Sequence, residues 1–345
     1  MNPVSLRRAA VPTMGAIGAL LLAACTNSGD PGQASADQTS PPDDTVAAGA
    51  NAYPVSVDNC GTEVTVPARP ERVVTIKSTT FELLLALGMG QHVVGHAFLD
   101  GPVPEEFAAD AAQVPELAER DPSTEVVLGT EPDLIFAGWE STFTDEGLGS
   151  RDSLHELGIA TYVAPPACQG EGYMPDPLTF EHIADQITEA GDVFGAPQQA
   201  ADLVAEQAEL LEDVVVSERE LRALWYSSGS DTPFVGAGIG APELLMQTVG
   251  LTNIAADVDD TWASMSWEAV ADAEPDVIVL VDSDWNTAEH KISVLESVPA
   301  MAALPAVAEG RYLVLDFPAT EAGIRSASAA VELGDQLAQL EARIP

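Results

Sequence analysis

The sequence predicts an α/β protein of two lobes, each built on a parallel, Rossmann-like sheet, with one long α-helix joining them. Three observations predict this class. Apolar, strand-like runs alternate with helical segments in two separate halves of the 345-residue chain. A phrase that begins at Glu125 returns at Glu268, and the longest helical pattern lies between the halves. A chain of this length can hold two domains that each have a core.

The repeated phrase is the strongest sign of duplication. Residues 125–135 read EVVLGTEPDLI, and residues 268–278 read EAVADAEPDVI. Each copy predicts a short helix led by a glutamate, a Pro-Asp turn and an apolar strand. We therefore expect Glu125 and Glu268 to occupy equivalent places on the two lobes and to present the same carboxylate to a partner.

Strand signals appear in order along both halves. Residues 53–58 and 62–66 alternate around an Asn-Cys-Gly turn, which predicts a hairpin. Four apolar runs then follow in each half, as expected for parallel strands covered by helices. These runs are Val73–Ile76, Val93–Gly95, Leu134–Ala137 and Thr161–Val163, then Ala223–Tyr226, Asn253–Ala255, Val277–Val281 and Tyr312–Leu315.

Helical segments separate these runs. Residues 82–88 and 243–250 each predict a helix stopped by glycine. Between the halves, Pro197 opens residues 198–216, where apolar side chains recur at helical spacing over about 30 Å. The predicted division is a first lobe at 53–195, a connecting helix at 196–216 and a second lobe at 217–345. One stiff helix favours limited rocking of the lobes.

The N-terminus predicts export and lipidation. Arg7 and Arg8 precede an apolar stretch that is too short and broken to span a membrane, and this stretch ends in the lipobox Leu22-Ala-Ala-Cys25. We expect a signal peptide at 1–24, a lipid on Cys25, a flexible tether at 25–52, and a protein anchored on the extracytoplasmic face of the cell membrane. The alternative is a plain signal peptide with a chance cysteine.

The net charge limits the classes of molecule that the protein can bind, and the cysteines predict a disulfide. With 13 basic and 55 acidic residues, the chain repels nucleic acid and anionic lipid, so membrane contact is expected only through Cys25. In an oxidising compartment Cys60 and Cys168 are expected to form a disulfide. Two free buried thiols are the alternative.

Ligands of open parallel sheets bind beyond the carboxyl ends of the strands. After the first strand come Lys77, Ser78, Thr79 and Thr80, which predict an anion site at a helix N-terminus. Simple helix capping with a solvated lysine is the alternative.

Aromatic side chains follow other strands. Trp139, next to Glu140, and Trp285 come after equivalent strands, so we expect the two indoles to face each other across a crevice and stack on a flat, conjugated ligand. Packing in a core is the alternative. The remaining candidates are the aromatic Trp262 (in a loop), Tyr173 and Tyr226, the loop residues Ser227, Ser228 and Gly238, and the cations Lys291 and Arg325.

Catalytic motifs are absent from the sequence. There is no Gly-x-Ser-x-Gly, His-Glu-x-x-His or Walker motif, and the five histidines form no ligand cluster, so we predict no enzyme, no cofactor and no metal. A tethered enzyme that uses Ser228 or Asp284 and a structural or adhesive surface protein are the competing classes.

Together, the lipobox, the two lobes, the single connecting helix and the paired glutamates resemble the substrate-binding lipoproteins of ABC importers (class III) that serve ferric siderophores, haem and cobalamin. The resemblance covers residues 55–345. It implies that Glu125 and Glu268 dock on arginines of a permease, that the permease and its ATPase are the partners, and that the protein is a monomer.

A narrower resemblance is to an actinobacterial subfamily assigned to a precursor of the deazaflavin coenzyme F-420. That compound is a flat tricycle with a phosphodiester and a carboxylate, so the resemblance implies an aromatic, anionic ligand, with a siderophore, haem or cobalamin as the alternative. The segments that carry it are 75–80, 138–141, 224–233 and 285–291.

Overall fold

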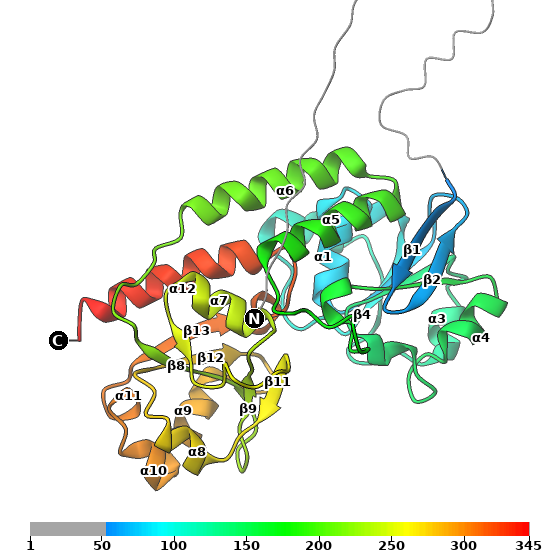
Figure 1. Ribbon diagram of the computed structural model, residues 1–345. Helices are drawn as coiled ribbons and strands as arrows, with labels where there is room; N and C mark the ends of the chain where they lie inside the picture. The colour runs from blue at the N-terminus through cyan, green and yellow to red at the C-terminus, as the bar shows by residue number, and fades with distance from the viewer. Residues whose placement is uncertain (1–52, 345) are drawn as a thin grey trace, which may run out of the picture. The chain divides into compact units, whose positions relative to one another are not determined.

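The first lobe is built on a wholly parallel sheet. The computed structural model describes residues 53–344, and the signal peptide, Cys25 and the tether predicted for 1–52 lie outside them. Five strands run in the order β5-β4-β3-β6-β7, and the hairpin β1-β2 lies beside them (Figure 1). The bounds are β1 Val55–Asn59, β2 Thr62–Val66, β3 Val73–Ile76, β4 Val93–Ala97, β5 Glu116–Ala118, β6 Leu134–Ala137 and β7 Ala160–Val163.

The second sheet is mixed, which corrects the prediction that it is parallel throughout. Its order is β11-β9-β8-β12-β13, with β10 also beside β8. Strand β9 is antiparallel to β8 because the chain turns back at Gly229, whose φ is +84°, and β11 is antiparallel to β9. The bounds are β8 Arg222–Ser228, β9 Phe234–Gly236, β10 Thr252–Asn253, β11 Trp262–Ser264, β12 Val277–Asp282 and β13 Tyr312–Asp316.

Twelve α-helices accompany these strands in the described part of the chain. Both sheets are covered on two faces, as the unbroken apolar runs predict. Along β12, Val277, Val279 and Val281 pack with α7 and α12, whereas Ile278 and Leu280 pack with α8, α9 and α10. The bounds are α1 Ser78–Ala86, α2 Ala108–Ala111, α3 Thr124–Leu128, α4 Arg151–Glu156, α5 Phe180–Phe194, α6 Pro197–Glu212, α7 Ala241–Thr248, α8 Trp267–Asp272, α9 Ala288–Ser297, α10 Pro299–Ala302, α11 Pro305–Ala308 and α12 Ser326–Glu341.

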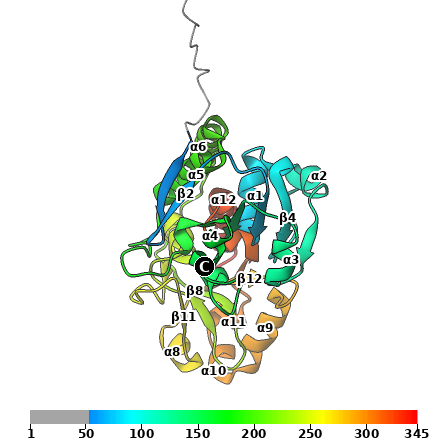
Figure 2. The same cartoon turned by 90° about the vertical axis from the view of Figure 1, so that its right-hand side faces the viewer.

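The connection between the lobes is a helical hairpin. Helix α5 ends at Gly195, which has a left-handed φ of +70°, and α6 starts at Pro197. Helix α6 lies against α5 and also against α12 (Figures 1 and 2). It ends four residues before the predicted limit of 216, where a run of β-branched valines disfavours further helix.

The duplication extends to individual hydrogen bonds. Ser123 caps α3 by accepting from the N–H of Val126, and Ser266 caps α8 by accepting from the N–H of Ala269. After each helix a glutamate takes positive φ, +50° at Glu131 and +47° at Glu274.

The Pro-Asp turns of the two copies are also alike. The carboxylate of Asp133 accepts from the backbone N–H of Arg72, just before β3, and that of Asp276 accepts from the N–H of Arg222, at the start of β8. The two copies of the phrase are thus equivalent in structure.

Candidate functional site

A cavity of about 330 Å³ lies between the two lobes. Its first wall comes from the end of β6 and the start of α1, with Thr79, Trp139 and Glu140. The opposite wall comes from β9, the segment before β11 and the segment after β13. Of the sequence-predicted ligand residues, Thr79, Trp139, Glu140 and Trp262 line this cavity. Its volume is within the range of small-molecule sites.

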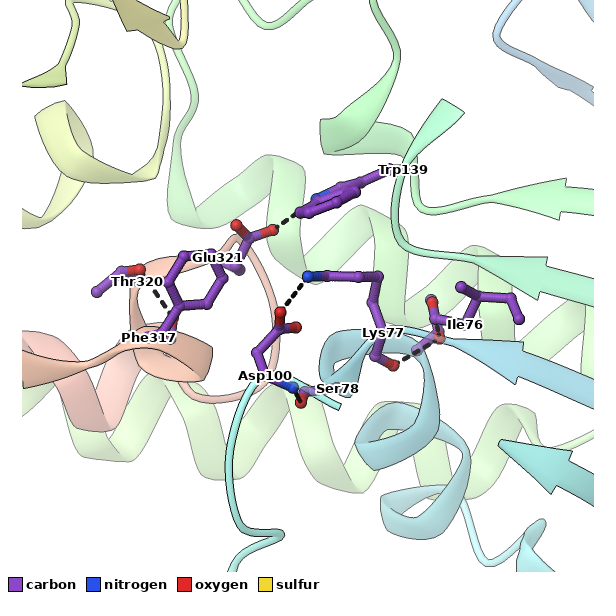
Figure 3. A network of polar contacts seen from close by, with 9 residues as sticks. Ile76, Lys77, Ser78, Asp100, Trp139, Phe317, Thr320 and Glu321 are labelled. Carbon is purple, nitrogen blue, oxygen red and sulfur yellow. Dashed lines mark hydrogen bonds and ion pairs between the residues drawn. The ribbon is translucent and has the colours of Figure 1, made fainter. Parts of the chain in front are cut away.

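Lys77 is buried behind the cavity wall, at 1% exposure. Its ammonium forms an ion pair with Asp100 and lies 3.6 Å from the ring centroid of Trp139 (Figure 3). The ring centroid of Phe98 is 4.2 Å from the same ammonium. Phe317 of the second lobe is 5.3 Å from the same ammonium. Lys77 is therefore enclosed by an aromatic cage, which excludes both the open anion site and the solvated lysine considered from the sequence.

Asp100 occupies the place predicted for an anion. Its backbone N–H donates to the hydroxyl of Ser78, and the backbone N–H of Ser78 helps to stabilise its carboxylate beside the N-terminus of α1. Burial raises the pKa of Asp100, and the neighbouring Lys77 opposes that rise. Ser78 and Thr80 are buried, and the Thr80 hydroxyl donates to the backbone of β3, so neither reaches the cavity.

Trp139 and Glu321 bridge the lobes at the cavity. The indole Nε1 donates to the Glu321 carboxylate at 3.2 Å (Figure 3). Glu321 follows β13 and is partly buried. Burial raises the pKa of its carboxyl group; Lys77 lowers that pKa, and Asp100 raises it further. One ammonium thus lies between two carboxylates at the back of the site.

The second-lobe wall is a stacked aromatic pair. Trp262 lies in β11, and its ring centroid is 5.9 Å from that of Phe234 with an interplanar angle of 16°. The prediction of a loop at Trp262 is wrong because the antiparallel pairing of β9 and β11 aligns these two side chains. Trp139 therefore shares the cavity with Trp262, whereas Trp285 is absent from its lining.

The remaining aromatic candidates lie elsewhere. Trp285 is 49% exposed and meets the edge of Phe317. Tyr226 is buried against Trp267 and donates to the carbonyl of Gly229, so it belongs to the core. Tyr173 donates to Asp58 at the hairpin and borders a separate groove.

The predicted loop residues also lie away from the cavity lining. Ser227 is buried in β8, and Ser228 ends the same strand. Gly238 fits closely against backbone, because a Cβ there would lie 2.1 Å from the carbonyl oxygen of Ala256.

The two cations predicted as ligand residues in the second lobe, Lys291 and Arg325, already have hydrogen-bond partners within the protein. Lys291 is fully buried and donates to the backbone carbonyls of Val281 and Asn286, and burial lowers its pKa to about 8. Arg325 donates to both carboxylate oxygens of Glu82, in α1, and to the carbonyl of Pro102. Neither cation lines the cavity, and Arg325 instead ties the second lobe to the first.

The remaining predicted residues are two cysteines and two glutamates. Cys60 and Cys168 form a disulfide, which links the hairpin to the loop after β7. Glu125 and Glu268 are both exposed and occupy the second position of α3 and of α8. In both views these helices lie away from α6 (Figures 1 and 2).

Sequence reasoning missed several residues of the site: Asp100, Glu321, Phe98, Phe234 and Asp260. A signal existed for the first two. Asp100 follows the predicted strand at 93 and Glu321 follows the one at 312, so the rule of carboxyl strand ends could have found them. Phe234 lies in β9 and Asp260 lies just before β11, and no apolar run in the sequence predicts either of these short strands.

Comparison with known proteins agrees with this architecture. The profile of the periplasmic binding protein family matches residues 73–319. The chain is 24% identical over 281 residues to an uncharacterized ABC transporter substrate-binding lipoprotein, YvrC of Bacillus subtilis, covering 77% of this chain and 78% of the relative.

Two further similarities concern proteins with a stated ligand. The chain is 26% identical to the vitamin B12-binding protein of Yersinia pestis, covering 63% of this chain and 72% of the relative. The crystal structure of an ABC-type Fe3+-hydroxamate transport system from Saccharomonospora viridis is similar with a TM-score of 0.70 and 27% identity, covering 83% of this chain and 99% of that one. Within residues 53–344, no helix has the length and hydropathy that a membrane crossing requires.

Proposed function

Because the chain belongs to the periplasmic binding protein family, we propose that it captures a small, flat ligand between its lobes and delivers it to the permease of an ABC importer. The observation that carries this proposal is the cavity between the lobes, with Trp139 on one wall and stacked Trp262 and Phe234 on the other. Indole rings on opposite walls suit a conjugated ring because stacking stabilises it from both sides.

Export, lipidation of Cys25 and anchoring on the extracytoplasmic face are part of the same proposal. They rest on the lipobox sequence and on the B. subtilis relative, which is a lipoprotein. A tethered enzyme has less support, because Ser228 ends a strand away from the cavity lining and no reactive pair accompanies it in the described residues.

The finer ligand assignment rests on the narrower resemblance alone. A deazaflavin precursor has a ring that suits the indoles, but its phosphodiester and carboxylate meet no lysine or arginine among the described residues that line the cavity. Siderophores, haem and vitamin B12 are the alternatives that the relatives suggest.

Capture is tested on protein purified from its own cells without denaturation. Mass spectrometry of the extracted small molecules is expected to show one conjugated compound at about one equivalent. The Trp262→Ala variant should lose it, whereas Trp285→Ala, which removes an exposed indole outside the cavity, should keep it. Equal loss from both variants would contradict capture in this cavity.

Delivery is tested through the paired glutamates. Exchange of both for arginine, Glu125→Arg with Glu268→Arg, is expected to abolish uptake of the co-purified compound by cells without changing its affinity for the protein. Glu209→Arg, an equivalent change at an exposed site on α6, is the control and should transport normally. Normal uptake by the double variant would refute the docking role.

A further inference from the structure

The cavity between the lobes carries only acidic charge among its described residues. Glu140, Asp260 and Glu321 line it, and no lysine, arginine or histidine does. Their hydrogen bonds come from backbone amides, one hydroxyl and one indole, and none of the three forms an ion pair within residues 53–344. Lys77, behind the cavity wall, lowers the pKa of Glu321 but is itself paired with Asp100, so the three lining carboxylates still raise the cost of placing a further negative charge in the same space.

The aromatic walls favour positive charge. The ammonium of Lys77 already lies over the ring of Trp139, so this indole makes a cation–π contact within the protein itself. Across the cavity, the stacked pair of Trp262 and Phe234 carries no cation among the described residues. Phe234 is 39% exposed, so this pair keeps aromatic surface that a cation entering the cavity can contact.

Thr79 adds a polar group to the same cavity. Its side chain is 7% exposed and lines the cavity, and its hydroxyl oxygen lies 3.0 Å from the place that a Cβ on Gly138 would take. A hydroxyl at the cavity wall can form a hydrogen bond with a polar atom of a ligand.

We propose that the ligand is a flat organic cation, with its ring between the indoles and its positive charge near Glu321. This inference rests on the proposed capture function and names the charge of what is captured. Burial raises the pKa of the Glu321 carboxyl group, and the nearest ammonium, that of Lys77, is already paired with Asp100. A ligand cation at this place would offset the burial of the carboxylate.

Three tricyclic probes of similar shape distinguish the contribution of ligand charge to affinity from that of ring stacking. Proflavine is a cation, lumiflavin is neutral and flavin mononucleotide is an anion. Each is titrated into the purified full-length mature protein and followed by tryptophan fluorescence and calorimetry. Proflavine is expected to bind one to one and at least about tenfold more tightly than lumiflavin, with flavin mononucleotide weakest. The advantage of proflavine should shrink with added salt.

Glu321→Gln is expected to lower proflavine affinity about tenfold and to leave lumiflavin affinity unchanged. Glu209→Gln removes the same charge from α6, outside the cavity, and should change neither. Flavin mononucleotide binding as tight as proflavine, an equal loss in the two variants, or binding of none of the probes would each overturn the proposal. The uptake defect of the paired-glutamate variant does not depend on these results, so the two proposals fail separately.

Discussion

The ion pair between Arg325 and Glu82 joins the two lobes and is largely buried. The Glu82 side chain is 2% exposed and that of Arg325 is 16% exposed. We consider Arg325→Met, which keeps most of the apolar stem and removes the charge. Glu82 is then left buried without its cation. Loss of one partner from a buried pair costs about 3–5 kcal/mol of unfolding free energy.

The pH dependence of this loss has a defined sign. Burial already raises the pKa of Glu82 above 4.5 in the folded protein, and Arg325 opposes the rise. Without Arg325 the folded pKa rises further, so the folded state holds a proton that the unfolded state releases. The stability of the variant therefore falls, relative to that of the original protein, as pH increases from 4.5 through the new pKa.

Urea denaturation between pH 4 and pH 8 measures this effect. The double variant Arg325→Met with Glu82→Gln should recover part of the stability and lose the pH dependence, because no buried charge remains. Arg311→Met is the matched control, since its partner Glu309 is 54% exposed and such pairs contribute about 0–1 kcal/mol. A loss for Arg325→Met no larger than that of the control, and equal at all pH values, would refute the reasoning.

Three further predictions concern stability. Replacing Cys60 and Cys168 by serine should lower the unfolding free energy by about 2–5 kcal/mol. If a reducing agent leaves the urea denaturation curve of the original protein unchanged, this prediction is contradicted. Lys291 has a folded pKa of about 8, below the 10.5 of a free lysine, so stability should rise by about 3 kcal/mol between those pH values, and Lys291→Met should flatten the rise. Burial lowers the pKa of His96, so stability should fall as pH drops below 6.5; equal acid sensitivity in His96→Phe would argue against this origin.

Much of the fold could be predicted because its signals are local. The apolar run at β6 matches the strand residue for residue, and the glycines at 88 and 250 take the positive φ expected after α1 and α7. The repeated phrase predicted two equivalent lobes, and the capping serines, turn carboxylates and exposed Glu125 and Glu268 agree with it. Strands β5, β9 and β11 were missed because each has only three residues, too few for a period to show.

The sequence by itself determined the residue types available for binding and the sheet edges at which they emerge, because periodicity, caps and turns act between residues close in the chain. Only the tertiary structure decided which of those residues meet. Trp139 reaches Glu321, which is 182 positions away, and Lys77 turns to Asp100 rather than to a ligand. The first contact depends on how the two lobes pack together and the second on how two strand ends of the first lobe meet, and no short-range pattern records either kind of packing.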